Sequence, residues 1–532
     1  MKGKSDFFRN ISQYVRKNPT EIVFGAYLFC IMMTSVCASV YQGNTFGAGL
    51  FIILVIYSVF SLVPKFHRWI REFSFTPHFE ISRKKKLQVF GIAGGIAFVV
   101  LLLWFIGSFP GSFTLDSIDQ YKQATNGTYN NWHPAWHTLL IFSLPLKLTG
   151  GWVGSIVLFQ IIYFSLLIGY MASIIYVYSG RTYTFLSVSF ILLNPYTLEI
   201  LMYPTKDVAF AIAAGLCMLW TVKIYFTKGK WFDKIYRIIL LAFMLANATL
   251  LRHNGILFSL FLLIALLYFM HKKKWFILFA ATCIIFVCIR IPLYSYFNVG
   301  EPNERIKETM GLPLSVIVNV AKDCPDRLDK QTSEFIDDLM CNQPDWKTRH
   351  NISGLNSVKW DGGGINNDAI EKAGVIGILK MMCHCLYVAP IESIKAIGGL
   401  TIPVYGLEVN TRELHEMPEN DMGIANNGVK IINELEHNYA YYVYKTPLQL
   451  FFTIGFTILV MLAVILFKSN FRSLEDWMRI LLCLPIFTYN FGTMLFLSGP
   501  DMRFFYVSFL VCPLVVLIMC GKRPDMPAHL NN

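Results

Sequence analysis

Charged residues are scarce in this sequence: Asp, Glu, Lys and Arg make up 15% of the 532 residues, whereas hydrophobic residues make up 55%. The mean hydropathy is correspondingly high, at +0.49. Together these values exclude a soluble globular protein of ordinary composition. We therefore expect an integral membrane protein.

Several motifs of other protein classes are also missing. There is no convincing internal repeat, so the inverted repeats of many secondary transporters are not supported. The glycine-rich stretch 361–364 lacks the Lys-Ser/Thr ending of a phosphate-binding loop and is interpreted as a flexible turn. Cys383, His384 and Cys385 have no second Cys/His pair to complete a metal site, which favours an apolar helix face.

What the sequence does contain is a long series of apolar runs. Most are about 17–25 residues long, enough for a helix to cross a hydrocarbon core roughly 30 Å thick. We predict an all-α polytopic membrane protein with about twelve transmembrane helices, at 21–41, 46–64, 88–107, 152–178, 183–202, 208–226, 236–251, 254–270, 275–297, 447–467, 476–497 and 504–520.

The distribution of Lys and Arg predicts the orientation. With twelve spans and a cytoplasmic N-terminus, seven basic segments all fall on the cytoplasmic side, as the positive-inside rule requires. Both termini are then cytoplasmic. The basic segments are the N-terminus, 65–87, Arg181, 228–237, 272–274, 468–472 and 522–523.

The longest hydrophilic stretch, 298–446, has the opposite charge. It carries 21 Asp and Glu against 14 Lys and Arg, a net charge of −7, so the rest of the chain carries +19. This asymmetry reflects membrane topology and contact with anionic lipids, and it argues against nucleic acid as a partner. Cys324 and Cys341 lie in this stretch and would be able to form a disulfide in an oxidising compartment.

These observations divide the chain into five regions. The stretch 298–446 is large enough to have its own core and is expected to be a mostly α extracytoplasmic domain between the ninth and tenth spans. Between the first external loop and the fourth span, the apolar segment 136–148 is too short to cross and is expected to be an interfacial or re-entrant helix. The regions are three N-terminal spans (1–107), the first extracytoplasmic loop (108–151), a six-helix membrane core (152–297), the extracytoplasmic domain (298–446) and three C-terminal spans with a cytoplasmic tail (447–532).

The first external loop contains two acids, Asp116 and Asp119, followed by Trp132, His133 and His137. At i and i+3 the acids share a face if 114–124 is helical, and they could serve one site as a general base or as ligands of a divalent ion. The alternative is a pair of solvated loop acids, with Asp116 capping a helix.

Three further polar groups fall on the same predicted side. Lys206 and Asp207 are either phosphate ligand and orienting acid or a snorkelling Lys with a helix cap. Arg252, followed by His253 and Asn254, lies between two spans, where the positive-inside rule disfavours an Arg. A buried guanidinium that binds phosphate would explain it.

The last of these groups holds Asp501 and Arg503 at the entrance of the final span. Arg503 is again on the side that the positive-inside rule disfavours. The alternative is a surface ion pair between the two residues, which would be worth little. Acids, phosphate-binding cations and aromatic residues together are what a lipid-phosphate-sugar donor requires.

The segments "LDSIDQY…WHPAWHTLL", "YPTKDVAF", "LLRHNG" and "PDMRFFYVSF" resemble a poorly characterised bacterial branch of the GT-C superfamily of polyprenyl-phosphate-sugar-dependent glycosyltransferases. The likeness covers roughly 105–297 and 447–520. It implies that Asp116 or Asp119 takes the loop-acid role and that Arg252 and Arg503 hold the lipid phosphate. The two acids are separated by two residues, not adjacent or one apart, so the base and any need for a divalent cation stay open.

The leading hypothesis is thus an integral-membrane glycosyltransferase of the bacterial plasma membrane. It would move a sugar from a polyprenyl-phosphate donor to an extracytoplasmic glycan, teichoic acid or glycolipid, with an Asp as base and inversion at the anomeric carbon. No cofactor is certain. The alternatives are a transporter or flippase of lipid-linked saccharides, or a polysaccharide polymerase or ligase. The predicted substrate-binding residues are Trp132, His133, His137, Lys206, Asp207, Arg252, His253, Asn254 and Arg503.

Overall fold

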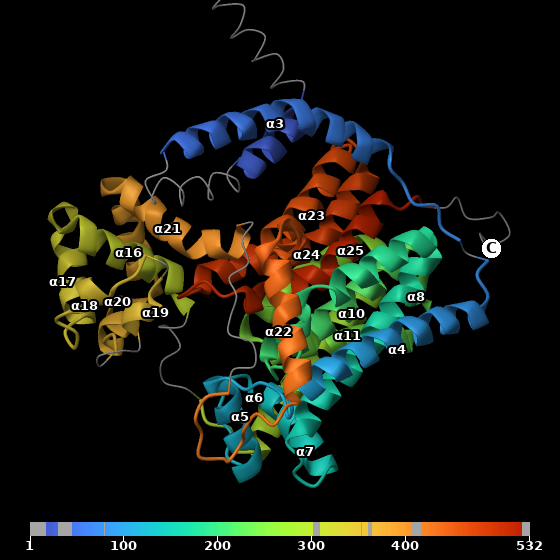
Figure 1. Cartoon of the computed structure of the whole chain (residues 1–532), viewed down its shortest axis with the longest axis horizontal. Coiled ribbons are helices and arrows are strands. Elements are labelled where there is room, and N and C mark those ends of the chain that lie inside the picture. Colours follow the sequence, from blue (N-terminus) through green and yellow to red (C-terminus); the bar gives the residue numbers. More distant parts are fainter. Residues whose placement is uncertain are drawn as a thin grey trace, which may run out of the picture.

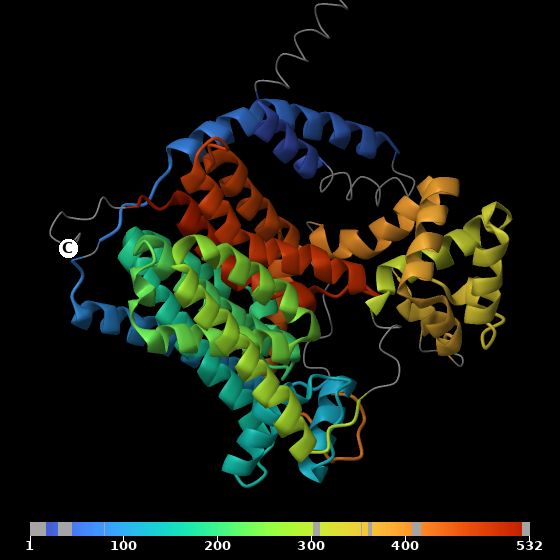
Figure 2. The same ribbon diagram turned by 180° about the vertical axis from the view of Figure 1, so that it is seen from behind.

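The fold is known from a computed structural model. It describes residues 18–29, 45–78, 80–301, 309–352, 354–359, 364–406 and 417–523. Within these ranges there are 22 α-helices and no sheet, so the prediction of an all-α protein is confirmed. Figures 1 and 2 show a helical bundle with a smaller helical unit beside it.

Six helical segments in the described ranges are long and apolar enough to cross a membrane, or seven if the bent pair α20 (Asn367–Val388) and α21 (Pro390–Tyr405) is one broken span. These lengths support a multi-pass membrane protein. The six are α4 (Arg83–Gly107), α8 (Gly154–Leu192), α10 (Lys206–Phe226), α13 to α14 (Lys272–Tyr296), α24 (Leu474–Phe496) and η8 with α25 (Met502–Cys520).

Shorter apolar helices account for three of the other expected spans, 236–251, 254–270 and 447–467, and for the expected interfacial segment 136–148. The expected span 152–178 and the first part of 183–202 lie in the 39-residue segment α8, and Gly180, with φ 81° and ψ −172°, breaks the helix between them. Twelve spans therefore stays a prediction. The shorter helices are the Ala135–Leu148 segment (α6, Ala135–His137; η1, Thr138–Ser143; α7, Leu144–Leu148), α11 (Ile235–Leu251), the His253–Phe269 segment (η3, His253–Gly255; α12, Ile256–Leu266; η4, Leu267–Phe269) and α23 (Ile454–Lys468).

Close helix packing holds the bundle together. Helix α4 lies along α8, α10 packs against α11 and α25, and α12 packs against α24. At the α4–α8 crossing, a Cβ on Gly169 would lie 2.6 Å from the carbonyl oxygen of Phe90, and one on Gly94 would lie 3.1 Å from that of Ser165. Only small residues permit such an approach, as at other membrane helix interfaces.

The region 298–446 does not form one unit. Its first part has its own hydrophobic core, which includes Leu314, Ile317, Leu339 and Ile370, and lies beside the bundle in Figure 1. Helix α22 (Lys430–Lys445) packs along α4 instead. We call the first part the external unit because it lies outside the helix bundle: α16 (Gly311–Asp323), α17 (Lys330–Leu339), α18 (Trp346–Arg349), α19 (Asn356–Lys359), α20 and the start of α21.

The remaining elements are the 28-residue helix α3, which contains the expected span 46–64, and the short helices of the first loop and of the connections. Cys324 and Cys341 are free thiols. Residues 361–363 of the glycine-rich stretch lie outside the described residues. These elements are α3 (Thr45–Glu72), α5 (Leu115–Asn126), α9 (Pro195–Ile200), η2 (Lys230–Asp233), η5 (Ile289–Leu293), η6 (Pro325–Arg327) and η7 (Pro447–Phe452).

Candidate functional site

Four segments that are distant in sequence meet at one end of the bundle, beside α5 and α6 in Figure 1. They are the first turn of α5, the start of α10, the residues that follow α11, and η8, which leads into α25. Capping fixes α5 locally, because Thr114 accepts a hydrogen bond from the Ser117 backbone N–H and Gly127 ends the helix with φ 71°.

The four segments enclose a cavity of about 390 Å³, which we call the polar cavity. Its lining includes residues from each of the four predicted polar groups. Two more, Asn356 and Lys359, come from the external unit, and Thr309 lies just before that unit. Its lining is Asp116, Trp132, His133, Lys206, Arg252, His253, Asn254, Thr309, Asn356, Lys359, Thr493, Phe496, Leu497, Ser498, Gly499, Asp501, Arg503 and Phe504.

The two loop acids occupy different surroundings. Asp116 lines the polar cavity, where its Oδ1 lies 3.8 Å from Nε2 of His133 and its Oδ2 lies 3.6 Å from Nη1 of Arg503. Asp119 is exposed, and its Oδ2 accepts a hydrogen bond from Gln123 Nε2. The i, i+3 spacing thus does not bring both carboxylates to the cavity, which lies on the Asp116 side of the helix.

His133 connects Asp116 with Lys206. Its Nδ1 is 3.0 Å from Lys206 Nζ, which donates to the ring because an ammonium has no acceptor. Burial, followed by the charges of Lys206 and Arg503, holds the pKa of His133 well below its usual value of 6.5. The ring is therefore neutral near pH 7, with Nδ1 as acceptor and the Nε2 proton on the side of Asp116.

A buried ion pair supports the floor of the cavity. Arg252 and Asp207 pair directly, with side chains only 6% and 1% exposed. Arg252 Nε also donates to Asn254 Oδ1 (2.6 Å), and Asn254 Nδ2 donates to Thr493 Oγ1 (2.7 Å). Asp207, which we expected to orient Lys206, thus pairs with an arginine.

Arg503 connects this ion pair to Asp116, the candidate catalytic residue. Its Nε lies 2.8 Å from Asp501 Oδ2 and 3.8 Å from Asp207 Oδ2, and its side chain is only 16% exposed. The Phe504 ring lies against both guanidinium groups, 4.4 Å from that of Arg252 and 5.2 Å from that of Arg503. The Asp501–Arg503 pair is therefore part of the cavity wall and not an isolated surface pair.

The other predicted residues divide into two groups. Trp132 and His253 line the polar cavity. His137 is fully buried, and its Nδ1 meets Nε2 of Gln120 at 2.9 Å, so it fixes the first loop against α5. His137 is absent from the lining of the polar cavity.

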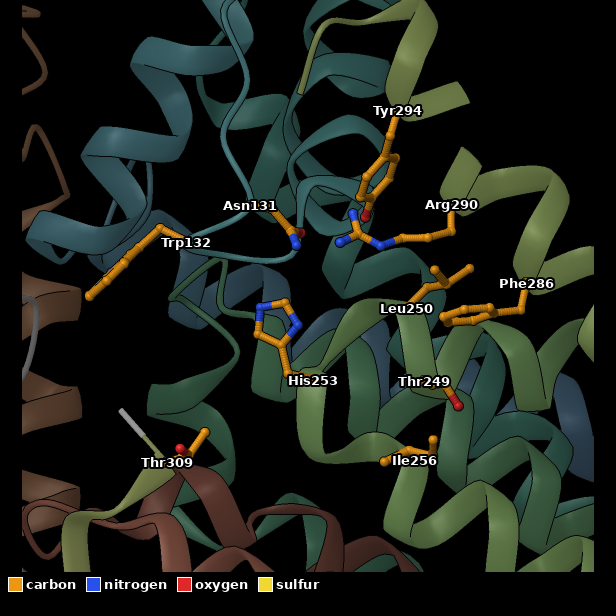
Figure 3. Close-up of a pocket in the computed structure, with 10 residues that line it drawn as sticks. All are labelled: Asn131, Trp132, Thr249, Leu250, His253, Ile256, Phe286, Arg290, Tyr294 and Thr309. Carbon is orange, nitrogen blue, oxygen red and sulfur yellow. The ribbon is translucent and has the colours of Figure 1, made fainter. Parts of the chain in front are cut away.

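A second cavity of about 340 Å³ adjoins the first, and we call it the apolar cavity. Figure 3 shows His253 extending between Trp132 and the apolar side chains Leu250 and Phe286. At its far end the Arg290 guanidinium lies 4.6 Å from the Tyr294 ring. The lining is Asn131, Trp132, Thr249, Leu250, His253, Ile256, Phe286, Arg290, Tyr294 and Thr309; Trp132, His253 and Thr309 belong to both cavities.

Metal binding finds no support in the part of the chain that the structure describes. No group of three or more His, Cys, Asp or Glu side chains there is arranged to hold an ion. The acids of the cavity instead face cations: Asp116 and Asp207 both lie within 4 Å of Arg503.

Sequence reasoning missed the contribution of the external unit. Asn356 and Lys359 line the polar cavity, and Lys359 Nζ donates to Ser498 Oγ across 139 positions of sequence (3.3 Å). No motif or periodicity around 356–359 indicated this, because the contact depends on how two units pack. No known protein family, curated protein or solved structure matches the chain.

Proposed function

We propose that the protein is an integral-membrane glycosyltransferase that moves a sugar from a polyprenyl-phosphate donor to an acceptor hydroxyl. The observation that carries the proposal is the polar cavity, in which the carboxylate of Asp116 faces a group of cations, whereas the second carboxylate of the lining, Asp501, is paired closely with Arg503. A glycosyl transfer by single displacement needs one base, and it needs positive charge where the phosphate leaves.

Asp116 is the proposed general base. It accepts the proton of the acceptor hydroxyl as that oxygen forms a bond to the anomeric carbon. The bond between that carbon and the phosphate oxygen breaks, and its electron pair leaves with the lipid phosphate. A single displacement inverts the anomeric centre. His133, whose neutral ring lies 3.8 Å from Asp116, orients the carboxylate or the acceptor.

Arg503 and Arg252 are the proposed phosphate ligands, with Lys206 beside them. Guanidinium groups bind phosphate in bidentate fashion and stay charged when buried. The pairing of Arg252 with Asp207 and its contact with Phe504 fix its orientation before the substrate binds. Such preorganised charge stabilises the leaving phosphate without a rearrangement during the reaction.

The apolar cavity is the proposed place for the first isoprene units of the donor. It shares Trp132, His253 and Thr309 with the polar cavity, so a lipid whose phosphate lies at Arg252 can pass directly into it. It lies beside α13, most of whose apolar side chains are not buried in the described protein, as suits contact with lipid.

The wider setting belongs to the same proposal. We place the enzyme in the bacterial plasma membrane, with both termini cytoplasmic, about twelve spans and the polar cavity on the extracytoplasmic side. The acceptor is a cell-envelope glycan, teichoic acid or glycolipid. A flippase of lipid-linked saccharides is the alternative, but it would need ionisable groups along a pathway across the membrane, whereas the described cluster lies at one end of the bundle.

The experiment that tests the proposal compares Asp116→Asn with Asp119→Asn in the purified full-length protein. Sugar transfer from polyprenyl-phosphate donors is measured with cell-envelope glycolipid as acceptor. We expect Asp116→Asn to abolish transfer and Asp119→Asn to keep most of it. Full transfer by folded Asp116→Asn would eliminate Asp116 as the base. Vesicle translocation of the lipid-linked sugar without any transfer would instead support a flippase.

A further inference from the structure

The bend between α20 and α21 carries exposed apolar side chains on the external unit. Gly374, with φ 62° and ψ 172°, interrupts α20. After it, exposed apolar residues recur at every third or fourth position, which places them on one face of each helix. Tyr387 is 86% exposed and Ile391 is 67% exposed. A contiguous patch of this kind marks an interaction surface. We call it the apolar apex: Ile376, Leu379, Cys383, Tyr387, Ile391 and Ile394.

The rest of the external unit has a different surface. On α17 the side chains of Lys330, Glu334 and Asp338 are 90%, 66% and 59% exposed. The two charges beside the bend neutralise each other, because Lys395 Nζ lies 2.9 Å from Glu392 Oε1. The unit thus has a charged side and an apolar side, as expected of a protein that lies on a bilayer.

The backbone at the bend has hydrogen-bond partners within the external unit. Together α20 and α21 are apolar enough for a broken span or a re-entrant loop, and they are bent by 119°. The last carbonyls of a helix have no partner within it, and lipid supplies none. The Val388 carbonyl at the end of α20 accepts from Arg327 Nη1 (3.3 Å), and the Glu392 carbonyl accepts from Asn319 Nδ2 (3.0 Å). Such internal donors are what a bend in lipid requires.

The apolar surface continues from the apex to the bundle. Figure 1 shows α21 extending from the external unit to the bundle, where it packs against α23. The ring of Tyr405, its last residue, lies 6.2 Å from that of Phe491 in α24, a candidate span. Phe491 and, one turn later, Leu495 are 48% and 53% exposed. The apex therefore extends the surface through which the bundle contacts lipid.

We propose that the apolar apex inserts into the bilayer, so that its partner is the acyl-chain layer of one leaflet. The bend turns the chain back toward the bundle, so α20 and α21 form a re-entrant, interfacial element that enters and leaves on the same side. Lys380, exposed at the edge of the face, reaches the headgroups by snorkelling. The external unit, which contributes Asn356 and Lys359 to the polar cavity, is thereby held at the membrane surface.

Two native cysteines of the external unit test this in the unmodified full-length protein. Cys383 belongs to the apolar apex, whereas Cys341 is exposed beside the polar side chain of Asn342. The protein in lipid nanodiscs is treated with a charged, membrane-impermeant maleimide, and mass spectrometry gives the rate at each cysteine. We expect Cys383 to react at least about tenfold more slowly than Cys341, since apolar surroundings disfavour the reactive thiolate. Denaturant should make the rates equal. If Cys383 reacts as fast as Cys341 in nanodiscs, the apex faces water and the proposal is wrong.

A second measurement distinguishes lipid from a covering protein, such as another copy of this chain. A spin label is attached at Ile391→Cys and, as the matched control, at Lys330→Cys, in a chain without other reactive cysteines. Both positions are exposed and lie in the first turn of a helix of the external unit.

The label is probed with oxygen, which partitions into lipid, and with a water-soluble nickel chelate. We expect the ratio of oxygen to nickel collisions to be several-fold higher at position 391 than at position 330. Equal ratios, or few collisions with either reagent at 391, would overturn the proposal, the second result because protein would cover the apex. Neither experiment depends on sugar transfer, so this proposal and the glycosyltransferase proposal stand or fall separately.

Discussion

The guanidinium of Arg503 lies 3.6 Å from a carboxylate oxygen of Asp116, although Asp116 lies in α5 and Arg503 lies in η8, just before α25. The same guanidinium lies 3.8 Å from Asp207, which pairs with Arg252. Arg503 therefore connects the proposed base to the buried ion pair under the cavity. A change at either end is expected to alter the position of the other.

Asp116→Asn should lower the rate of sugar transfer by about 10²–10⁴-fold, because general base catalysis typically contributes this much. The substitution keeps the volume of the side chain and removes its ability to accept a proton. Asp119→Asn, three residues along the same helix, should change the rate less than about threefold, since that carboxylate is exposed. Single-turnover kinetics measure the effect. Equal losses in the two variants would contradict the separation of the acids.

Asp207→Asn should destabilise the protein by about 3–5 kcal/mol, because it leaves the charge of Arg252 buried without its carboxylate. Combining it with Arg252→Met should recover part of that stability but none of the phosphate binding. Thermal unfolding in detergent gives the first result and binding of polyprenyl phosphate gives the second. If Asp207→Asn alone is as stable as the wild type, the ion pair between Asp207 and Arg252 does not stabilise the fold.

Stability should depend on pH through His133. Its pKa is well below 6.5 in the folded protein and near 6.5 in the unfolded chain, so the unfolded state binds the extra proton first. The stability that comes from keeping His133 neutral is therefore fully present above about pH 6.5, and it is lost as the pH falls toward the pKa of the folded state. His133→Gln should flatten the unfolding profile between about pH 6.5 and 5. His271→Gln, at an exposed position, is the control. If the pH dependence of unfolding is the same in His133→Gln as in the wild type, it comes from other groups.

Ile256→Trp should fill part of the apolar cavity. We expect KM for a long-chain polyprenyl donor to rise roughly tenfold with little change in kcat, because the chain loses apolar burial worth about 1–2 kcal/mol. A donor with a single isoprene unit should be affected less. Leu260→Trp, on the same helix but outside the lining, is the matched variant. Loss of activity with both donors alike would place the lipid chain elsewhere.

The sequence was informative where one local property decides the outcome. Apolar run length predicted the helices α10, α24 and α25, and the positive-inside rule singled out Arg252 and Arg503, which meet in the cavity. The sequence also placed a boundary between two spans at Arg181, and the neighbouring Gly180 has non-helical φ and ψ angles that break α8 at that point.

The sequence did not predict the contacts between segments that are distant along the chain. The i, i+3 spacing of Asp116 and Asp119 describes the helix but not the direction from which the rest of the protein meets it. Lys359 shows no local signal at all, because its environment comes from Ser498 in another part of the fold. The pairing of Asp207 with Arg252, instead of a role beside Lys206, likewise depends on how α10 packs against α11.

The order in which the cavity wall is synthesised has a consequence for folding. Asp116 leaves the ribosome long before Asp501, Arg503 and Phe504. Until the segment that contains Arg503 has been synthesised and has packed against α5, Asp116 lacks the guanidinium that lies 3.6 Å from it in the folded protein. The polar cavity is therefore one of the later features of the fold to form.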